Sequence, residues 1–148
     1  MITPAQKPPR EVTIAMVKVT DKEAETIRRN KTKIKKMENV ELEKSIAHIT
    51  VEIIEYIPNS VVIKTILKKS TGNISVMSFD SGEGLTEKTT PFDTFAQIID
   101  GQAEIVINGK SNVLLTGESI VIPAHAANFV RPNGRFKMIL TVIKSGYE

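Results

Sequence analysis

The sequence contains no cysteine. This absence excludes disulfide bridges, thiolate nucleophiles, zinc fingers and iron–sulfur clusters, and it is typical of a reducing compartment, so we expect a cytoplasmic location. The chain also has no apolar run that approaches the roughly 18 residues of a membrane-spanning helix. The N-terminal region carries prolines and charges where a signal peptide needs a continuous apolar stretch. We therefore expect neither export nor a membrane partner.

A large excess of charge of one sign is missing as well. The formal net charge is +3, and much of the positive charge lies between Arg28 and Lys36. A nucleic-acid-binding surface would need more positive charge than this, so no nucleic-acid partner is predicted. With 148 residues, of which 41% are hydrophobic and 25% are charged, the chain fits one globular domain with a single core.

The N-terminal region differs in pattern from the remainder of the chain. Prolines among its first nine residues prevent a continuous helix there. Further on, Ile27, Ile34 and Met37 fall near one helical face, but this apolar stripe is thin. A peripheral basic helix and a partly disordered arm both fit the pattern. We predict an N-terminal extension over residues 1–36, followed by a barrel domain over residues 37–148.

From Asn39 onward, runs rich in Val, Ile, Phe and Thr predict β-strands. We expect strands at residues 61–67, 73–79, 93–99, 103–107, 119–122 and 135–144. They are separated by residues that tolerate positive φ, as hairpin turns require. These turns are expected at Thr71-Gly72-Asn73, Asp100-Gly101, Asn108-Gly109 and Asn133-Gly134. The stretch from Ser45 to Tyr56 fits a short helix or a strand, and the whole pattern predicts an all-β sandwich or barrel.

The last predicted strand is nearly apolar on both faces. Its sequence from Phe136 to Ile143 reads FKMILTVI and does not alternate cleanly. A strand that is buried on both sides in so small a protein usually packs on something outside its own barrel. A homodimer is the simplest source of that contact, and we predict one.

Two blocks of the sequence resemble the motifs of the cupin family. Residues 82–101, GEGLTEKTTPFDTFAQIIDG, keep the framework of the motif G-x5-H-x-H-x3-E-x6-G. Residues 117–128, GESIVIPAHAAN, keep the framework of G-x5-P-x-G-x2-H. Together with the hairpin between the blocks and the strand after them, the region from Met37 to Lys144 resembles the small single-domain cupins. The resemblance implies a jelly-roll β-barrel of two antiparallel sheets.

The departures from these motifs fall on the positions that hold a metal ion in the family. The two histidines of the first motif correspond to Lys88 and Thr90, its glutamate corresponds to Thr94, and the histidine of the second motif corresponds to Asn128. An ammonium group has no lone pair to donate and repels a divalent cation, and neutral oxygens compete poorly with water for one. We therefore predict no metal and no other cofactor.

These positions could instead form a polar pocket with one positive charge. Lys88, Thr90, Thr94 and Asn128 are candidates for the barrel lumen, and His125 is a fifth candidate because it lies in the second motif near the barrel mouth. A lysine among hydroxyl and amide groups suits a small carboxylate or phosphate. The prediction is a metal-free cupin barrel that binds a small polar or anionic ligand, or that serves only as a dimeric fold. No catalytic residue is predicted.

Other readings stay open from the sequence alone. Lys88 could extend out of the barrel mouth, or it could pair with Glu83, Glu87 or Asp93. It could also act as a base or a Schiff-base amine, although the motif offers it no partner acid. The alternative from another class is a metal-dependent enzyme, of the dioxygenase or isomerase type, with a rebuilt site that uses His125.

Overall fold

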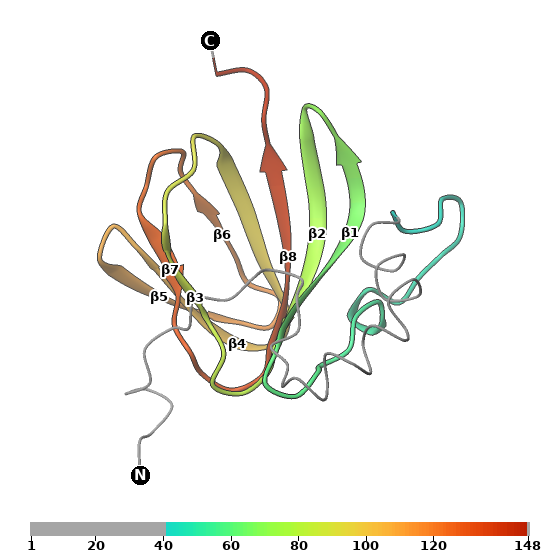
Figure 1. The fold of residues 1–148 in the computed structure, drawn as a ribbon, viewed down its shortest axis with the longest axis horizontal. Coiled ribbons are helices and arrows are strands. Elements are labelled where there is room, and N and C mark those ends of the chain that lie inside the picture. Colours follow the sequence, from blue (N-terminus) through green and yellow to red (C-terminus); the bar gives the residue numbers. More distant parts are fainter. Residues whose placement is uncertain (1–40, 148) are drawn as a thin grey trace, which may run out of the picture.

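The computed structural model describes residues 41–147, which form eight β-strands and one short 3-10 helix (Figure 1). The elements are η2 (Thr50–Glu52), β1 (Val61–Lys69), β2 (Gly72–Phe79), β3 (Leu85–Lys88), β4 (Asp93–Ile107), β5 (Lys110–Leu115), β6 (Ser119–Ile122), β7 (Asn128–Val130) and β8 (Phe136–Ile143). Within residues 41–147, no helix has the length and apolar character needed to cross a bilayer. The predicted N-terminal extension, its helix and the boundary between residues 36 and 37 lie outside the described residues.

All the strand pairs are antiparallel, and the sheet curls into a barrel (Figure 1). The strand order is β1-β2-β8-β4-β7-β3, and β5 and β6 also pair with β4. The first half of β4 pairs with β8 and β6, and its second half pairs with β5 and β7. This long strand therefore belongs to both sheets of the barrel, and the predicted all-β jelly-roll architecture is confirmed.

The prediction of two separate strands at residues 93–99 and 103–107 is wrong. They form the single 15-residue strand β4, which bends at Asp100 and Gly101 instead of reversing there. The pairing with β8 shifts register between Ile98 and Asp100, and Gly101 has a φ of 82°. An Asp-Gly pair permits positive φ in a bulge as well as in a turn, so the local sequence does not distinguish the two. At Asn108-Gly109, by contrast, φ is 49° and 80°, and the chain does form the predicted hairpin.

Three strands were not predicted from the sequence. They are β3, β5 and β7, and each is short or carries charged and polar residues. Their hydrogen bonds to longer strands stabilise them, and this tertiary pairing overrides their weak β-propensity. The stretch from Ser45 to Tyr56 is neither a helix nor a strand, and its only regular structure is the single 3-10 turn η2.

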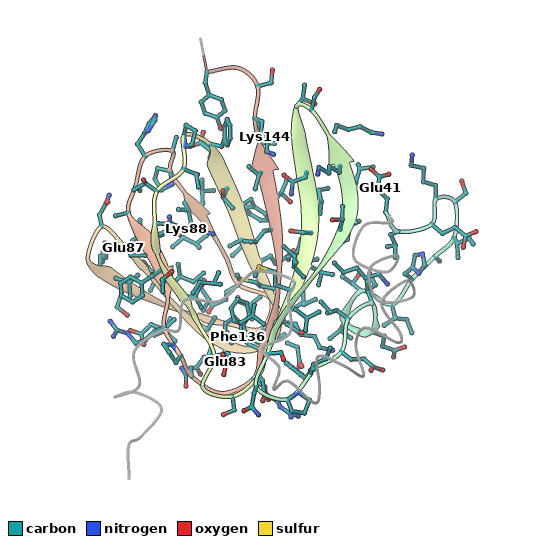
Figure 2. The ribbon with its side chains drawn as sticks, viewed as in Figure 1. Glu41, Glu83, Glu87, Lys88, Phe136 and Lys144 are labelled. Atoms are coloured by element: carbon teal, nitrogen blue, oxygen red, sulfur yellow. The ribbon has the colours of Figure 1, made fainter. Side chains whose placement is uncertain are left out.

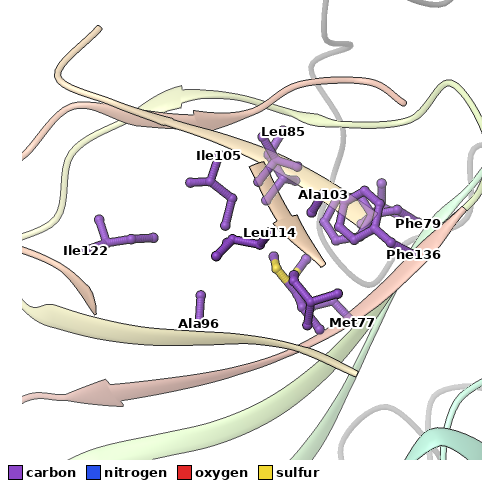
Figure 3. Close-up of a cluster of buried hydrophobic side chains, with 13 residues drawn as sticks. Met77, Phe79, Leu85, Ala96, Ala103, Ile105, Leu114, Ile122 and Phe136 are labelled. Atoms are coloured by element: carbon purple, nitrogen blue, oxygen red, sulfur yellow. The ribbon is translucent and has the colours of Figure 1, made fainter. Parts of the chain in front are cut away.

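The hydrophobic core lies inside the barrel, where side chains from both sheets meet (Figure 3). Phe79 at the end of β2 and Phe136 at the start of β8 are fully buried, and their rings stack with centroids 4.3 Å apart and planes 12° apart. The stacked rings fill the end of the barrel where β8 begins, whereas Lys144 follows the other end of that strand (Figure 2). The opposite end of the barrel is less tightly filled and holds the cavity described below.

Part of the outer face of β8 is covered by the chain's own residues 49–56. Lys137 donates a hydrogen bond to the carbonyl of Val51 at 2.7 Å, and its ammonium lies 4.9 Å from the ring centroid of Tyr56. The Tyr56 hydroxyl donates to the carboxylate of Asp100 at 2.6 Å, and burial, followed by this bond, raises the pKa of Tyr56. The apolar outer face was our reason to expect a homodimer. The contacts of residues 49–56 already bury part of this face within one chain, which weakens that reason. The homodimer stays a prediction.

Candidate ligand-binding site

A cavity of about 250 Å³ lies inside the barrel, between the two sheets. Every strand except β1 and β5 contributes to its wall. The lining residues are mostly apolar, with two lysines and a few neutral polar residues among them. They are Leu85, Phe92, Ile105, Ile122, Phe129, Val130, Met138, Leu140 and Val142, together with Asn73, Lys88, Thr90, Thr94, Asn128 and Lys144.

The cavity runs from an apolar floor to a positively charged rim. Alternate residues of β8 and its C-terminal extension face inward and show this gradient directly. Met138 is 1% exposed, Leu140 and Val142 are partly buried, and Lys144 is exposed. Thr94 lies level with Val142 on the neighbouring strand β4, where the two residues are register partners. A molecule that enters from solvent therefore meets the lysines before it meets the apolar floor.

Lys88 reaches this cavity from the other sheet. It ends β3, where it is the register partner of Asn128 on β7, and its side chain extends from the strand toward the barrel interior (Figure 2). Burial of the ammonium group among neighbouring protein atoms lowers the pKa of Lys88. The residue still keeps enough accessible surface to be exposed overall, so water reaches the rim of the cavity and the desolvation is only partial.

Neither lysine of the cavity is neutralised by a carboxylate within residues 41–147. No acidic residue lines the cavity, and neither Lys88 nor Lys144 forms an ion pair there. The predicted alternative in which Lys88 pairs with Glu83, Glu87 or Asp93 therefore does not occur. The Asp93 carboxylate accepts a hydrogen bond from the backbone N–H of Ala124 at 2.8 Å instead. The ammonium of Lys144 lies 5.9 Å from the ring centroid of Phe92, as in a cation–π contact.

The four substituted motif positions all line the cavity, but only some of their side chains have hydrogen-bonding groups that are free to bind a ligand. The Thr90 hydroxyl donates to the carbonyl of Phe92 at 3.1 Å. The amide of Asn128 donates to the carbonyl of Ala126 at 3.0 Å and to that of Lys88 at 3.3 Å. Thr90 and Asn128 therefore hold the backbone together at the rim. In the described part of the chain, the side chains of Lys88 and Thr94 make no hydrogen bond and remain available to a ligand.

The structure does not bring the side chain of His125 into the cavity. His125 is exposed, has a φ of 68° and donates its backbone N–H to the carbonyl of Thr90 at 2.7 Å. It occupies the place of the glycine in the second cupin motif, where the turn requires positive φ. That requirement explains the position without any role for the imidazole, and the residue is not among those that line the cavity.

The donor set of the cavity does not fit a first-row metal ion. At the four family positions it supplies an ammonium and three neutral oxygen- or nitrogen-bearing side chains, and two of these already bond to the backbone. Across residues 41–147, no three His, Cys, Asp or Glu side chains come together as a metal site would need. A rebuilt site around His125 would require such a group. We derive no metal chemistry for this barrel.

Lys144 and the apolar wall of the cavity were not predicted from the sequence. The sequence does carry a pattern that indicates them. Met138, Leu140, Val142 and Lys144 are spaced two residues apart, as are residues that share one face of a strand. Two of the outer residues of the same strand, Ile139 and Ile143, are also apolar, so the alternation in the sequence is weak. Pairing with β4 and β2 decides which set faces inward.

Comparison with solved structures finds cupin proteins with the same kind of antiparallel barrel. A cupin 2 conserved barrel domain protein from Leptotrichia buccalis is 32% identical, with a TM-score of 0.62 over 64% of this chain and 46% of that chain. A cupin superfamily protein from Desulfitobacterium hafniense is 25% identical, with a TM-score of 0.67 over 72% of this chain and 97% of that chain. A conserved protein of unknown function from Streptococcus pyogenes is 23% identical, with a TM-score of 0.68 over 72% of this chain and 94% of that chain.

No family model and no curated protein matches the sequence. The structural likeness, the two motif frameworks and the antiparallel barrel together identify the chain as a small cupin barrel. The resemblance deduced from the sequence is thereby confirmed for the fold. The change of all four metal-ligand positions is a feature of this sequence that these comparisons do not address.

Proposed function

We propose that this cupin barrel is a metal-free binding protein for a small organic anion. The observation that carries the proposal is the pair of lysines, Lys88 and Lys144, in a cavity that no acidic residue of the range 41–147 lines. Positive charges that line a partly dry cavity without a carboxylate to balance them are unfavourable. An anion that enters the cavity removes this penalty and gains charge-assisted hydrogen bonds.

Lys88 supports the proposal more strongly than the other rim residues. Its pKa is lowered by burial, which means that the protonated form is disfavoured while the cavity holds no counter-charge. A carboxylate beside the ammonium would offset this cost of burial. The Thr94 hydroxyl and the Asn73 amide, which make no side-chain hydrogen bond in the described part of the chain, could orient the bound group.

The metal-free part of the proposal is tested by elemental analysis. We expect untagged, purified protein to contain far less than one equivalent of iron, manganese, nickel or zinc after dialysis, because no imidazole or carboxylate of residues 41–147 lines the cavity. Inductively coupled plasma mass spectrometry measures this directly. One equivalent of any of these metals, retained through dialysis, would contradict the proposal and would revive a metal-dependent enzyme with a rebuilt site.

Anion binding is tested by substitution of Lys88. We expect Lys88→Met to weaken binding of benzoate, measured by isothermal titration calorimetry at pH 7, by about 10-fold to 100-fold, since a charge-assisted hydrogen bond contributes about 1.5–3 kcal/mol. Lys110→Met is the matched control, because Lys110 is exposed in the hairpin between β4 and β5 and does not line the cavity. This control variant should bind benzoate as the original protein does.

The same substitution should leave the ligand-free protein at least as stable as before. Lys88→Met removes a partly desolvated charge from an apolar cavity, and water at the rim limits the gain, so we expect a rise in Tm of no more than about 2 °C. Weaker binding together with an unchanged or higher Tm would separate a ligand-binding role from a structural one. Equal benzoate affinity in Lys88→Met and the original protein would overturn the proposal.

A further inference from the structure

The shape and lining of the cavity indicate which kind of anion it takes, an inference that rests on the proposed anion-binding function. From the geometry of the cavity we infer that the ligand is a small monocarboxylate with an unbranched or compact apolar body of about six carbons, bound with its carboxylate at the rim and its body on the floor.

The polarity of the wall argues against strongly hydrophilic anions. Nine of the lining residues are apolar, and the floor is formed by Ile105 and Met138, which are each 1% exposed. A sugar phosphate or a dicarboxylate would leave hydroxyls or a second charge against this floor without hydrogen-bond partners, at a substantial desolvation cost. An apolar body would gain free energy from the same contact.

The distribution of charge places the carboxylate at one end of the ligand. Both lysines lie at the rim, where Lys88 ends β3 and Lys144 follows β8, and no charged residue lines the floor. The cavity is therefore amphipathic along its length. A ligand with a single terminal charge matches this gradient, because its charged end stays among the cations and its other end enters the apolar part.

The volume limits the size of the ligand. A water-sized group occupies about 30 Å³, so a cavity of about 250 Å³ holds roughly eight such groups. Hexanoate has six carbons and two oxygens and so fills the cavity approximately, whereas acetate leaves most of the apolar wall uncovered. A much longer chain would have to extend out of the mouth.

A series of straight-chain carboxylates tests this inference. We expect calorimetric affinity to increase about fourfold for each methylene between butanoate and hexanoate, which corresponds to about 0.8 kcal/mol per buried methylene. Beyond the length that fills the cavity, from octanoate to decanoate, the increase should stop. Hexanamide, which has the same length without the charge, should bind at least 10-fold more weakly than hexanoate.

Substitutions at two adjacent residues of β8 test where the apolar body of the ligand binds. Val142 lines the cavity from β8, while the next residue, Ile143, is 50% exposed. Val142→Thr keeps the shape of the side chain and adds a hydroxyl to the wall, so we expect it to reduce the affinity for hexanoate about threefold to tenfold and that for acetate much less. Ile143→Thr is the matched control and should change neither affinity. Melting curves of both variants establish that they remain folded.

The outcomes separate this inference from the function on which it rests. If phosphate or succinate binds more tightly than hexanoate, or if affinity does not depend on chain length, the inferred ligand class is wrong. The proposed anion-binding function would still stand. If Val142→Thr and Ile143→Thr affect hexanoate equally, the placement of the body is wrong. If none of these anions binds, or if Lys88→Met binds them all as the original protein does, the proposed function itself is wrong.

Discussion

Gly101→Ala is expected to destabilise the barrel by about 3 kcal/mol or more. Gly101 has a φ of 82°, and a Cβ atom added there would lie 2.3 Å from the carbonyl oxygen of Arg135 and 3.1 Å from two atoms of Phe136. The left-handed conformation costs an alanine about 1–2 kcal/mol, and overpacking adds about 1–3 kcal/mol. Because backbone atoms make the clash, relief requires the bend of β4 to open.

Urea unfolding at neutral pH measures this effect, and Gly109→Ala provides a closely matched control. Gly109 has nearly the same φ, 80°, but a Cβ added there meets no atom within 4 Å. This variant should therefore lose only the conformational part, about 1–2 kcal/mol. The bend in β4 would not be the constraint we infer if Gly101→Ala lost no more stability than Gly109→Ala.

The second large effect is expected for Asp80→Asn, at the closed end of the barrel. Asp80 is 8% exposed, and its carboxylate accepts hydrogen bonds from the backbone N–H of Asn59 and from the Nε of Arg135, both at 2.7 Å. It thus connects the loop before β1 to the chain that enters β8. Loss of the charge weakens both bonds, and we expect a loss of about 2–3 kcal/mol, because each bond to a charged group contributes about 1.5–3 kcal/mol and the asparagine retains part of each.

This contribution should depend on pH in a defined direction. Burial alone would raise the pKa of Asp80, but the bonds from Asn59, Arg135 and the backbone of Ser81, with the Arg135 charge, together lower it. A carboxyl whose pKa is lower in the folded state stabilises the protein fully above its unfolded pKa of about 3.9, and this stabilisation is lost as the pH falls through the folded pKa. The difference in stability between the original protein and Asp80→Asn should therefore be constant near neutral pH and shrink below about pH 4.

Urea titrations from pH 7 to pH 3 test this expectation, with Asp93→Asn as the control. Asp93 is an exposed carboxylate with a single hydrogen bond, from the backbone of Ala124, and its replacement should cost about 0.5–1 kcal/mol. An Asp80→Asn variant whose loss is the same at pH 3 as at pH 7 would show that the charge of Asp80 is not what stabilises this corner.

The four positions that hold metal ligands in the cupin motifs carry side chains of different roles in this barrel. At the four family positions, Lys88 and Thr94 keep free side chains toward the cavity, while Thr90 and Asn128 bond to the rim of the backbone. In the sequence the four positions are equivalent, since each replaces a metal ligand of the motifs. Only the hydrogen bonds show that two of them hold the structure and two are available for binding.

The sequence by itself determined the class of fold and the poor set of metal donors. Both follow from local properties: the β-forming runs and glycines recur at barrel spacing, and the identity of Lys88 or Thr94 decides whether that side chain can donate an electron pair. The turn at Asn108-Gly109 was predicted for the same reason, since its backbone conformation depends on two adjacent residues.

The tertiary structure decided the continuity of β4, the absence of His125 from the cavity and the presence of Lys144 at its rim. Each of these depends on which distant strands pair and in what register, and one register step reverses the face to which every side chain of a strand points. Lys88 and Lys144 are remote in sequence. They reach one cavity because β3, which carries Lys88, pairs with β7, and because β7 and β8 both pair with β4. A charge pattern of this kind is a property of the closed barrel, and no local segment contains it.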